Sequence, residues 1–190
     1  FSPNDILTDW LTANCTPGTT TVYVDMDGVL TAYYQAVATY ATNNGLLDSG
    51  GDWYNLTPEI ELAALAASAG SYFQNLAKRA EADALIDLVI AKNGSYEILS
   101  TTTSTSMTNQ KNAWIDANLT GARAPAARNY ATGFNKGPYG GANKLLIDDR
   151  LNYINQFEAA GGKGFKYFES GGIRRFGGRE ASVGPVSLIS

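Results

Sequence analysis

Three short apolar segments, far apart in the chain, each end directly on acidic or hydroxyl side chains. Residues 21–24 (TVYV) lead into Asp25-Met-Asp27, residues 96–99 (YEIL) into Ser100-Thr101, and residues 144–147 (KLLI) into Asp148-Asp149. Their β-branched, aliphatic and aromatic content predicts buried strands. Segments with helical spacing separate them, which favours a parallel sheet whose strands bring their carboxyl ends to one ligand-binding edge. We therefore predict an α/β fold in which these polar side chains converge.

The segments between the strands supply the helices of this fold. We expect helices at 30–42, 57–69, 72–90, 111–119 and 151–160, and a last strand at about 165–168. Thr57 followed by Pro58 is typical of an N-cap and a first helical residue. The hydroxyl run 100–106 fits either a low-complexity linker or a binding loop, since it follows a strand directly.

Composition restricts the chemistry. The 190 residues contain no histidine and one cysteine, Cys15. This excludes Ser-His-Asp triads, histidine-bound metals, cysteine-based zinc sites and a disulfide within the chain. Catalysis would have to use carboxylates, lysines, hydroxyls and a hard metal ion.

The acids at the strand ends fit such chemistry. Asp25 and Asp27 alternate along an extended backbone, so their side chains share one side. With Asp148 they form a carboxylate cluster that repels itself without a cation, and Mg²⁺ is the ion that suits so few oxygen ligands. A carboxylate can also attack phosphorus. Each acid alone could instead be a cap, a turn residue or a solvated charge, and for Asp149 this explanation is equally good. An EF-hand is excluded because Gly28 is fourth in its loop rather than sixth.

The ordered set of motifs resembles the haloacid-dehalogenase superfamily. Its first, second and fourth motifs are matched by residues 22–30 (VYVDMDGVL), 98–100 (ILS) and 145–149 (LLIDD). Within the superfamily, the sequence is most similar to the 5′(3′)-deoxyribonucleotidases and their phage and bacterial relatives. That likeness rests on residues 25–30 (DMDGVL), 110–114 (QKNAW), 135–136 (NK) and 146–150 (LIDDR), with aromatic residues at 51–53 and 71–73 similar to elements that flank the nucleoside. The sequence departs from the family in the hydroxyl run after Ser100 and at 76–81, where a proline-containing turn is absent.

The resemblance implies a fold and an activity. The fold is a Rossmann-like three-layer α/β/α core, residues 1–30 and 81–190, with a small helical cap, residues 31–80, inserted after the first strand. The activity is Mg²⁺-dependent hydrolysis of phosphomonoesters, in particular of nucleoside monophosphates.

The resemblance also implies residue roles. Asp25 attacks phosphorus, and Asp27 protonates the leaving group and then activates water. Mg²⁺ is held by Asp25, the Asp27 carbonyl oxygen and Asp148, with Asp149 nearby. The phosphoryl group is bound by Ser100, Thr101, Lys111 and Lys136.

Plainer interpretations stay open for several residues. Lys111 could be an exposed helix lysine and Lys136 a surface-loop lysine. Trp114 fits the core better than a ligand contact. Four aromatic side chains could either stack on a substrate or pack the cap helices together, namely Trp53, Tyr54, Tyr72 and Phe73. Another small phosphomonoester, such as a sugar phosphate, could be the substrate, or the chain could be a catalytically idle binding or structural module of a larger assembly.

Charge and hydropathy indicate the surroundings. The net charge is −4 and no Lys/Arg-rich run occurs, which argues against a nucleic-acid polymer as partner. No apolar stretch approaches the ~20 residues of a membrane span, and residues 1–10 lack a signal-peptide pattern. We expect a cytoplasmic protein whose partner is a small phosphorylated substrate; a homodimer is compatible with the sequence.

Overall fold

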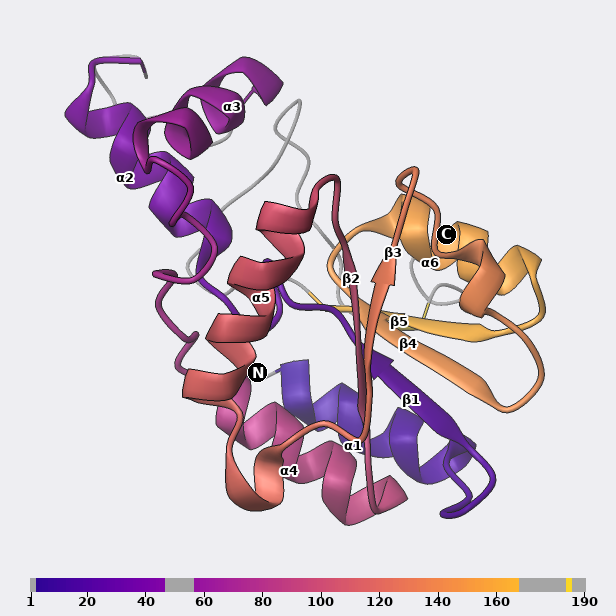
Figure 1. The fold of residues 1–190 in the computed structure, drawn as a ribbon. Coiled ribbons are helices and arrows are strands. Elements are labelled where there is room, and N and C mark those ends of the chain that lie inside the picture. The colour runs from indigo at the N-terminus through magenta and orange to yellow at the C-terminus, as the bar shows by residue number, and fades with distance from the viewer. Residues whose placement is uncertain (1–2, 47–56, 168–183, 186–190) are drawn as a thin grey trace.

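The computed structural model describes residues 3–46, 57–167 and 184–185 (Figure 1). The elements in chain order are α1 (Pro3–Asn14), β1 (Thr21–Val24), α2 (Tyr33–Asn43), α3 (Pro58–Ala67), α4 (Ala82–Asn93), β2 (Glu97–Thr101), α5 (Thr105–Asn118), η2 (Gly121–Arg123), β3 (Arg128–Ala131), η3 (Gly137–Tyr139), β4 (Lys144–Asp148), α6 (Leu151–Ala159), β5 (Lys163–Lys166) and β6 (Gly184–Pro185).

One sheet with the strand order β3-β2-β1-β4-β5-β6 forms the centre of the molecule. The first five strands pair in parallel, and β6 pairs antiparallel with β5. Val24, the last residue of β1, is in register with Ile98 of β2 and Ile147 of β4. The residues that follow these three strands therefore lie at the same edge of the sheet.

Side-chain alternation builds a hydrophobic core on each face of the sheet. Val22 and Val24 of β1 lie in the larger core with residues of α1, α4 and α5. Tyr23 faces the other way, into a smaller core with Ile154 and Phe157 of α6. Figure 1 shows the same division, with α1, α4 and α5 on one side of the sheet and α6 on the other. This three-layer arrangement confirms the predicted α/β/α fold class.

Helices α2 and α3 lie beyond the carboxyl end of β1, away from α1 and α4 (Figure 1). The hydroxyl of Tyr33 on α2 donates to Glu61 Oε1 on α3 (2.9 Å). Thr57 is the N-cap of α3 as predicted, since its side chain accepts from Ile60 N. Both helices fall in the predicted cap segment 31–80, whose boundaries stay a prediction.

The chain enters and leaves α2 and α3 through two segments that lie side by side. Ala32 N donates to Ala77 O (2.9 Å), and Arg79 N donates to Leu30 O (2.9 Å). Because residues 77–79 hydrogen-bond here, they cannot continue a helix. The predicted helix 72–90 is therefore only α4, beginning at Ala82.

Three other element boundaries differ from the sequence predictions. The helix expected at 30–42 begins at Tyr33, because residues 26–31 form a tight turn. The hydroxyl run contains the N-cap of α5, Ser104, whose side chain accepts from Met107 N, so this helix begins at Thr105 rather than Lys111. The last predicted strand is β5 at Lys163–Lys166, and Phe168 lies outside the described residues. Neither α1 nor β3 was predicted.

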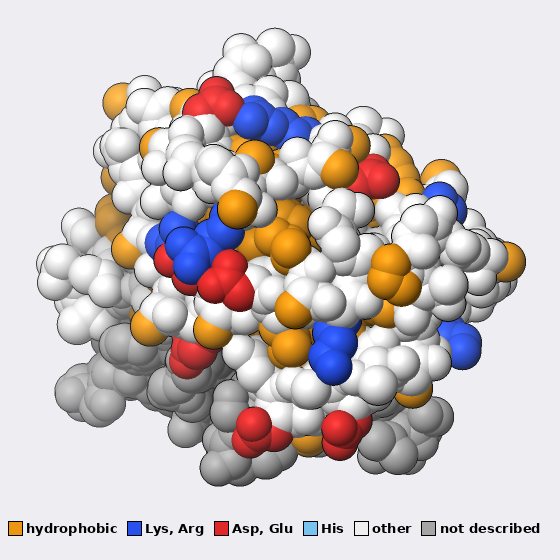
Figure 2. All heavy atoms as spheres, turned by 90° about the horizontal axis from the view of Figure 1, so that it is seen from below, with side chains coloured by type: hydrophobic (Ala, Val, Ile, Leu, Met, Phe, Trp, Pro, Cys, Tyr) orange, Lys and Arg blue, Asp and Glu red, His pale blue; other side chains and the backbone are white. Residues whose placement is uncertain are grey.

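The face shown in Figure 2 carries scattered acidic and basic side chains, some of which lie side by side. Ion pairs account for two arginines on the surface, Arg123 with Asp87 and Arg128 with Asp116. Among the helices that the structure describes, none combines the length and the apolar character that crossing a membrane requires.

Candidate active site

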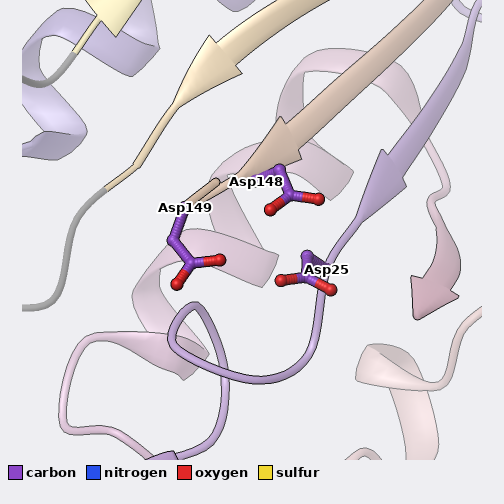
Figure 3. Close-up of side chains that lie close together, drawn as sticks. All are labelled: Asp25, Asp148 and Asp149. Atoms are coloured by element: carbon purple, nitrogen blue, oxygen red, sulfur yellow. The ribbon is translucent and has the colours of Figure 1, made fainter. Parts of the chain in front are cut away.

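Three carboxylates from two neighbouring strands meet at the carboxyl edge of the sheet. Asp25 follows β1, Asp148 ends β4 and Asp149 comes next; Figure 3 shows the three side chains grouped together. One oxygen from each lies within 4.8 Å of the others, and all three residues are buried. The strand ends converge as predicted, but the cluster contains Asp149 in place of the predicted Asp27. Buried carboxylates this close need compensating positive charge.

A tight turn after Asp25 makes room for this cluster. Met26 O accepts hydrogen bonds from Leu30 N and Thr31 N, and Arg79 Nη1 donates to Gly28 O (3.2 Å). Gly28 has a φ of 86°, and a Cβ there would lie 2.2 Å from Asp149 Oδ2. Any other residue would be strained and would collide with the carboxylate.

Lys136 supplies positive charge to the cluster. Its side chain is fully buried, and Nζ lies 2.6 Å from Asp148 Oδ2, 2.9 Å from Asp25 Oδ1 and 3.1 Å from Leu99 O. The surface-loop interpretation of this lysine is therefore wrong. Burial lowers the pKa of Lys136, but the Asp148 and Asp25 carboxylates outweigh it and raise that pKa, so the lysine is charged.

The surroundings of Asp25 shift the pKa of its carboxyl group in opposite directions. Burial is the largest and raises its pKa, and the Asp148 carboxylate raises it further. Lys136 and, more weakly, Lys111 act in the other direction by favouring the ionised carboxylate. The balance leaves the pKa of Asp25 above its usual value, so additional positive charge would favour its ionised form.

A second lysine connects the ends of β1 and β2. Lys111 on α5 is buried, and its Nζ donates to Ser100 Oγ (2.7 Å) and to Thr101 O (2.8 Å). The same ammonium forms an ion pair with Asp27 Oδ2 (3.1 Å) and lies 5.0 Å from the centroid of the Phe73 ring. The exposed-lysine interpretation is wrong here as well.

Asp27 has surroundings different from those of Asp25. Its Oδ1 accepts a hydrogen bond from Thr31 Oγ1 (2.9 Å), its Oδ2 pairs with Lys111, and the side chain is 19% exposed. Its carboxylate is not part of the three-acid cluster. The predicted metal contact of Asp27, through its carbonyl oxygen, stays a prediction. The two aspartates of the first motif are thus held separately, each by its own lysine.

A cavity of about 400 Å³ opens onto these residues. Asp25, Asp27, Ser100, Thr101 and Lys111 line its polar end. The Thr101 hydroxyl donates to Tyr153 OH (3.0 Å), so this side chain already has a protein partner.

Other lining residues were absent from the sequence predictions. Arg150 directs Nε and Nη2 to Tyr34 OH (3.0 and 2.6 Å), and both residues line the cavity. Phe134 and Tyr153 line it too. Arg150 could have been predicted from the sequence, because it directly follows Asp148 and Asp149. No local sequence pattern distinguishes Phe134.

Of the four aromatic side chains expected near the substrate, the structure describes Tyr72 and Phe73. Phe73 lines the cavity and also stacks on Tyr33, with ring centroids 5.9 Å apart, so it belongs both to the wall and to the packing. Tyr72 packs edge-on against Tyr33. Trp114 is fully buried core, as predicted. Trp53 and Tyr54 lie outside the described residues.

Comparison with known proteins supports the fold. No family model matches the sequence, and no curated protein matches it. A haloacid dehalogenase-like family hydrolase from Xanthomonas campestris is similar in structure, with a TM-score of 0.54, 12% identity and 88% of each chain covered. A haloacid-dehalogenase-superfamily hydrolase, subfamily IA, from Geobacter sulfurreducens has a TM-score of 0.51 and 12% identity, covering 86% of this chain and 95% of its own.

A further similar structure is an L-2-haloacid dehalogenase from Xanthobacter autotrophicus with chloropropionic acid covalently bound. Its TM-score is 0.50 at 12% identity, with 76% of each chain covered. The chain therefore has the fold of haloacid-dehalogenase-like hydrolases, as the motifs predicted.

Proposed function

We propose that this chain is a Mg²⁺-dependent phosphomonoester hydrolase that works through an aspartyl-phosphate on Asp25. The observation that carries the proposal is that two nearby aspartates at one end of a cavity form ion pairs with different lysines. Asp25 pairs with Lys136, and Asp27 pairs with Lys111. Two carboxylates with distinct surroundings can divide the nucleophilic and acid–base roles between them.

Asp25 is the proposed nucleophile. Lys136 holds its Oδ1 at 2.9 Å, which fixes the carboxylate and favours its ionised form. The carboxylate attacks phosphorus, the bond from phosphorus to the ester oxygen breaks, and phosphate becomes attached to Asp25. Water then attacks the same phosphorus, which releases inorganic phosphate and regenerates the carboxylate.

Asp27 is the proposed acid and base. Thr31 and Lys111 orient its carboxyl group. In the first step its proton passes to the departing ester oxygen, and in the second step it accepts a proton from the attacking water. Its partial exposure is consistent with access to solvent between the two steps.

Ser100 and Lys111 are the proposed ligands of the transferring phosphoryl oxygens. The Ser100 hydroxyl and the Lys111 ammonium lie 2.7 Å apart beside the two aspartates. Phosphoryl transfer depends on positioning and on electrostatic stabilisation, which two such donors supply.

A divalent cation fits the acid cluster. Four aspartates lie at this edge with three cations, Lys111, Lys136 and Arg150, so a dianionic phosphate would add to a remaining excess of negative charge. Asp25, Asp148 and Asp149 offer hard oxygen ligands within 4.8 Å of one another, as Mg²⁺ prefers. When bound, the ion neutralises charge on the phosphoryl oxygens.

Nucleoside monophosphates are the proposed substrates. The cavity of about 400 Å³ falls within the usual range for small-molecule sites, and aromatic side chains line it beyond the polar end. The motif combination similar to the deoxyribonucleotidases supports the same substrate class.

Phosphate release from nucleoside 5′- and 3′-monophosphates and from sugar phosphates tests this proposal. We expect release with Mg²⁺, none with EDTA, and loss of activity in Asp25→Asn. Asp116→Asn, an exposed acid on α5 outside the cavity, is the matched control and should retain activity. Efficient hydrolysis of sugar phosphates but of no nucleotide would refute the substrate class. No release from any ester would favour the idle binding module.

A further inference from the structure

Phe134 is an aromatic side chain exposed at the wall of the cavity. It is 57% exposed, whereas Ala131 before it and Lys136 after it are buried. Of the four exposed large hydrophobic side chains in the described ranges, Phe134 and Leu62 line this cavity. Burial in the core therefore does not account for this phenylalanine.

Backbone preference does not account for it either. Phe134 has a φ of 52° and follows Gly133 with a φ of 64°. Glycine or asparagine adopts this left-handed conformation with less strain than a phenylalanine does. The position combines an unfavourable backbone with an exposed apolar ring.

The loop that carries the ring is fixed by α6. Gln156 Nε2 donates to Phe134 O (3.1 Å), and Gln156 Oε1 accepts from Lys136 N (2.9 Å). Asn135 Oδ1 accepts from Gly137 N (2.9 Å). One glutamine thus holds the backbone of both Phe134 and the lysine that contacts Asp25, so the backbone that carries the ring is fixed relative to the reacting end.

The cavity changes character from its buried end to its mouth. Asp25, Ser100 and Lys111 are buried at the polar end. Phe134 and Leu62, which is 66% exposed, mark the open end. An ester whose phosphate lies at the polar end would place its leaving group among side chains that are mostly apolar or aromatic.

We infer that Phe134 is a specificity-determining residue that selects phosphomonoesters with a planar aromatic leaving group. The inference rests on the proposed function. It assigns the choice between leaving groups to a ring on the loop between β3 and η3, outside the predicted cap segment. A flat ring can stack offset or edge-on against Phe134, whereas a puckered aliphatic ring of similar size makes only general apolar contact.

Benzyl phosphate and cyclohexylmethyl phosphate form a matched pair of substrates, since both are esters of primary alcohols and differ mainly in ring planarity. We expect the wild-type protein to hydrolyse the benzyl ester with the higher kcat/KM. Phe134→Ala should lower kcat/KM for that ester by about two- to twelvefold, chiefly through KM, and leave the cyclohexylmethyl ester within about twofold. Phe134→Tyr should retain the preference. Leu46→Ala, an exposed side chain that does not line the cavity, is the control and should change neither ester.

The outcomes separate this inference from the function on which it rests. Equal losses for both esters in Phe134→Ala, or no loss for either, would overturn the inference while the hydrolase proposal stands. No phosphate release from either ester by the wild-type protein would overturn the proposed function and the inference with it.

Discussion

Replacing Lys136 with methionine tests whether this lysine neutralises the acid cluster. The side chain is fully buried and lies within 3 Å of both Asp25 Oδ1 and Asp148 Oδ2, at 2.9 and 2.6 Å. Methionine preserves much of the volume but removes the charge, which leaves two buried carboxylates facing each other and Asp149. Removing one partner of a buried ion pair typically costs about 3–5 kcal/mol, because the remaining charge is uncompensated.

The expected cost is large enough to measure and depends on metal. For a chain of this size, about 3–5 kcal/mol corresponds to a decrease in Tm of roughly 6–20 °C. Mg²⁺ should stabilise Lys136→Met more than the wild-type protein, because the ion replaces the missing positive charge between the carboxylates. Urea denaturation in EDTA and in Mg²⁺, followed by tryptophan fluorescence, measures both effects, since Trp10 and Trp114 are buried in the folded protein.

Two controls make the result specific. Lys163→Met removes an exposed lysine that bonds Asn14 and should change stability by no more than about 0.5 kcal/mol. Asp148→Asn in the Lys136→Met background should recover part of the loss, because it removes one of the repelling charges. A Lys136→Met protein as stable as the wild type in EDTA would refute the assignment of Lys136 as the counter-charge of the cluster.

Two further substitutions probe the turn after β1. Gly28→Ala should lower the free energy of unfolding by about 1–3 kcal/mol through backbone strain, and by a further amount through the contact with Asp149. Gly18 has a similar φ of 84° and nothing within 4 Å of its added Cβ, so Gly18→Ala should show the strain alone. Equal unfolding free energies of the two variants in urea would contradict the close approach to Asp149. Asp27→Asn should lower kcat/KM by about 10²–10⁴-fold for benzyl phosphate. The loss should be smaller for 4-nitrophenyl phosphate, whose leaving group needs less protonation, and equal losses would contradict the role of Asp27 as the acid.

Strands β1, β2 and β4 were predictable because each is a short apolar run buried on both faces, as parallel strands between helices are. β3 is an edge strand with the sequence Arg-Asn-Tyr-Ala, and only Ala131 is buried, so hydropathy gave no strand signal. Helix α1 could have been predicted, since Leu7, Trp10 and Leu11 are buried at helical spacing.

The candidate site was predictable where a strand directly precedes a polar residue, as at Asp25, Ser100 and Asp148. Lys136 shows the limit of such reasoning. Its neighbours in sequence, Asn135 and Gly137, are typical of a surface loop. Its burial results from carboxylates contributed by two other strands, and no local pattern encodes that convergence. The absence of helix between residues 72 and 81 could not be predicted for the same reason, because it depends on hydrogen bonds to the distant residues 30–32.

Helix α5 anchors the end of the segment that returns from α2 and α3. Gln110 Oε1 accepts from Phe73 N (2.9 Å), and Trp114 Nε1 donates to Leu76 O (2.8 Å), one helical turn apart on either side of Lys111. The base of the α2–α3 pair is therefore attached to the same helix that carries Lys111, the proposed phosphate ligand. A change in the tilt of these two helices would also have to bend the paired segments 30–32 and 77–79 and strain the hydrogen bonds from Arg150 to Tyr34. The position of α2 and α3 and the alignment of Lys111 are therefore mechanically linked through α5.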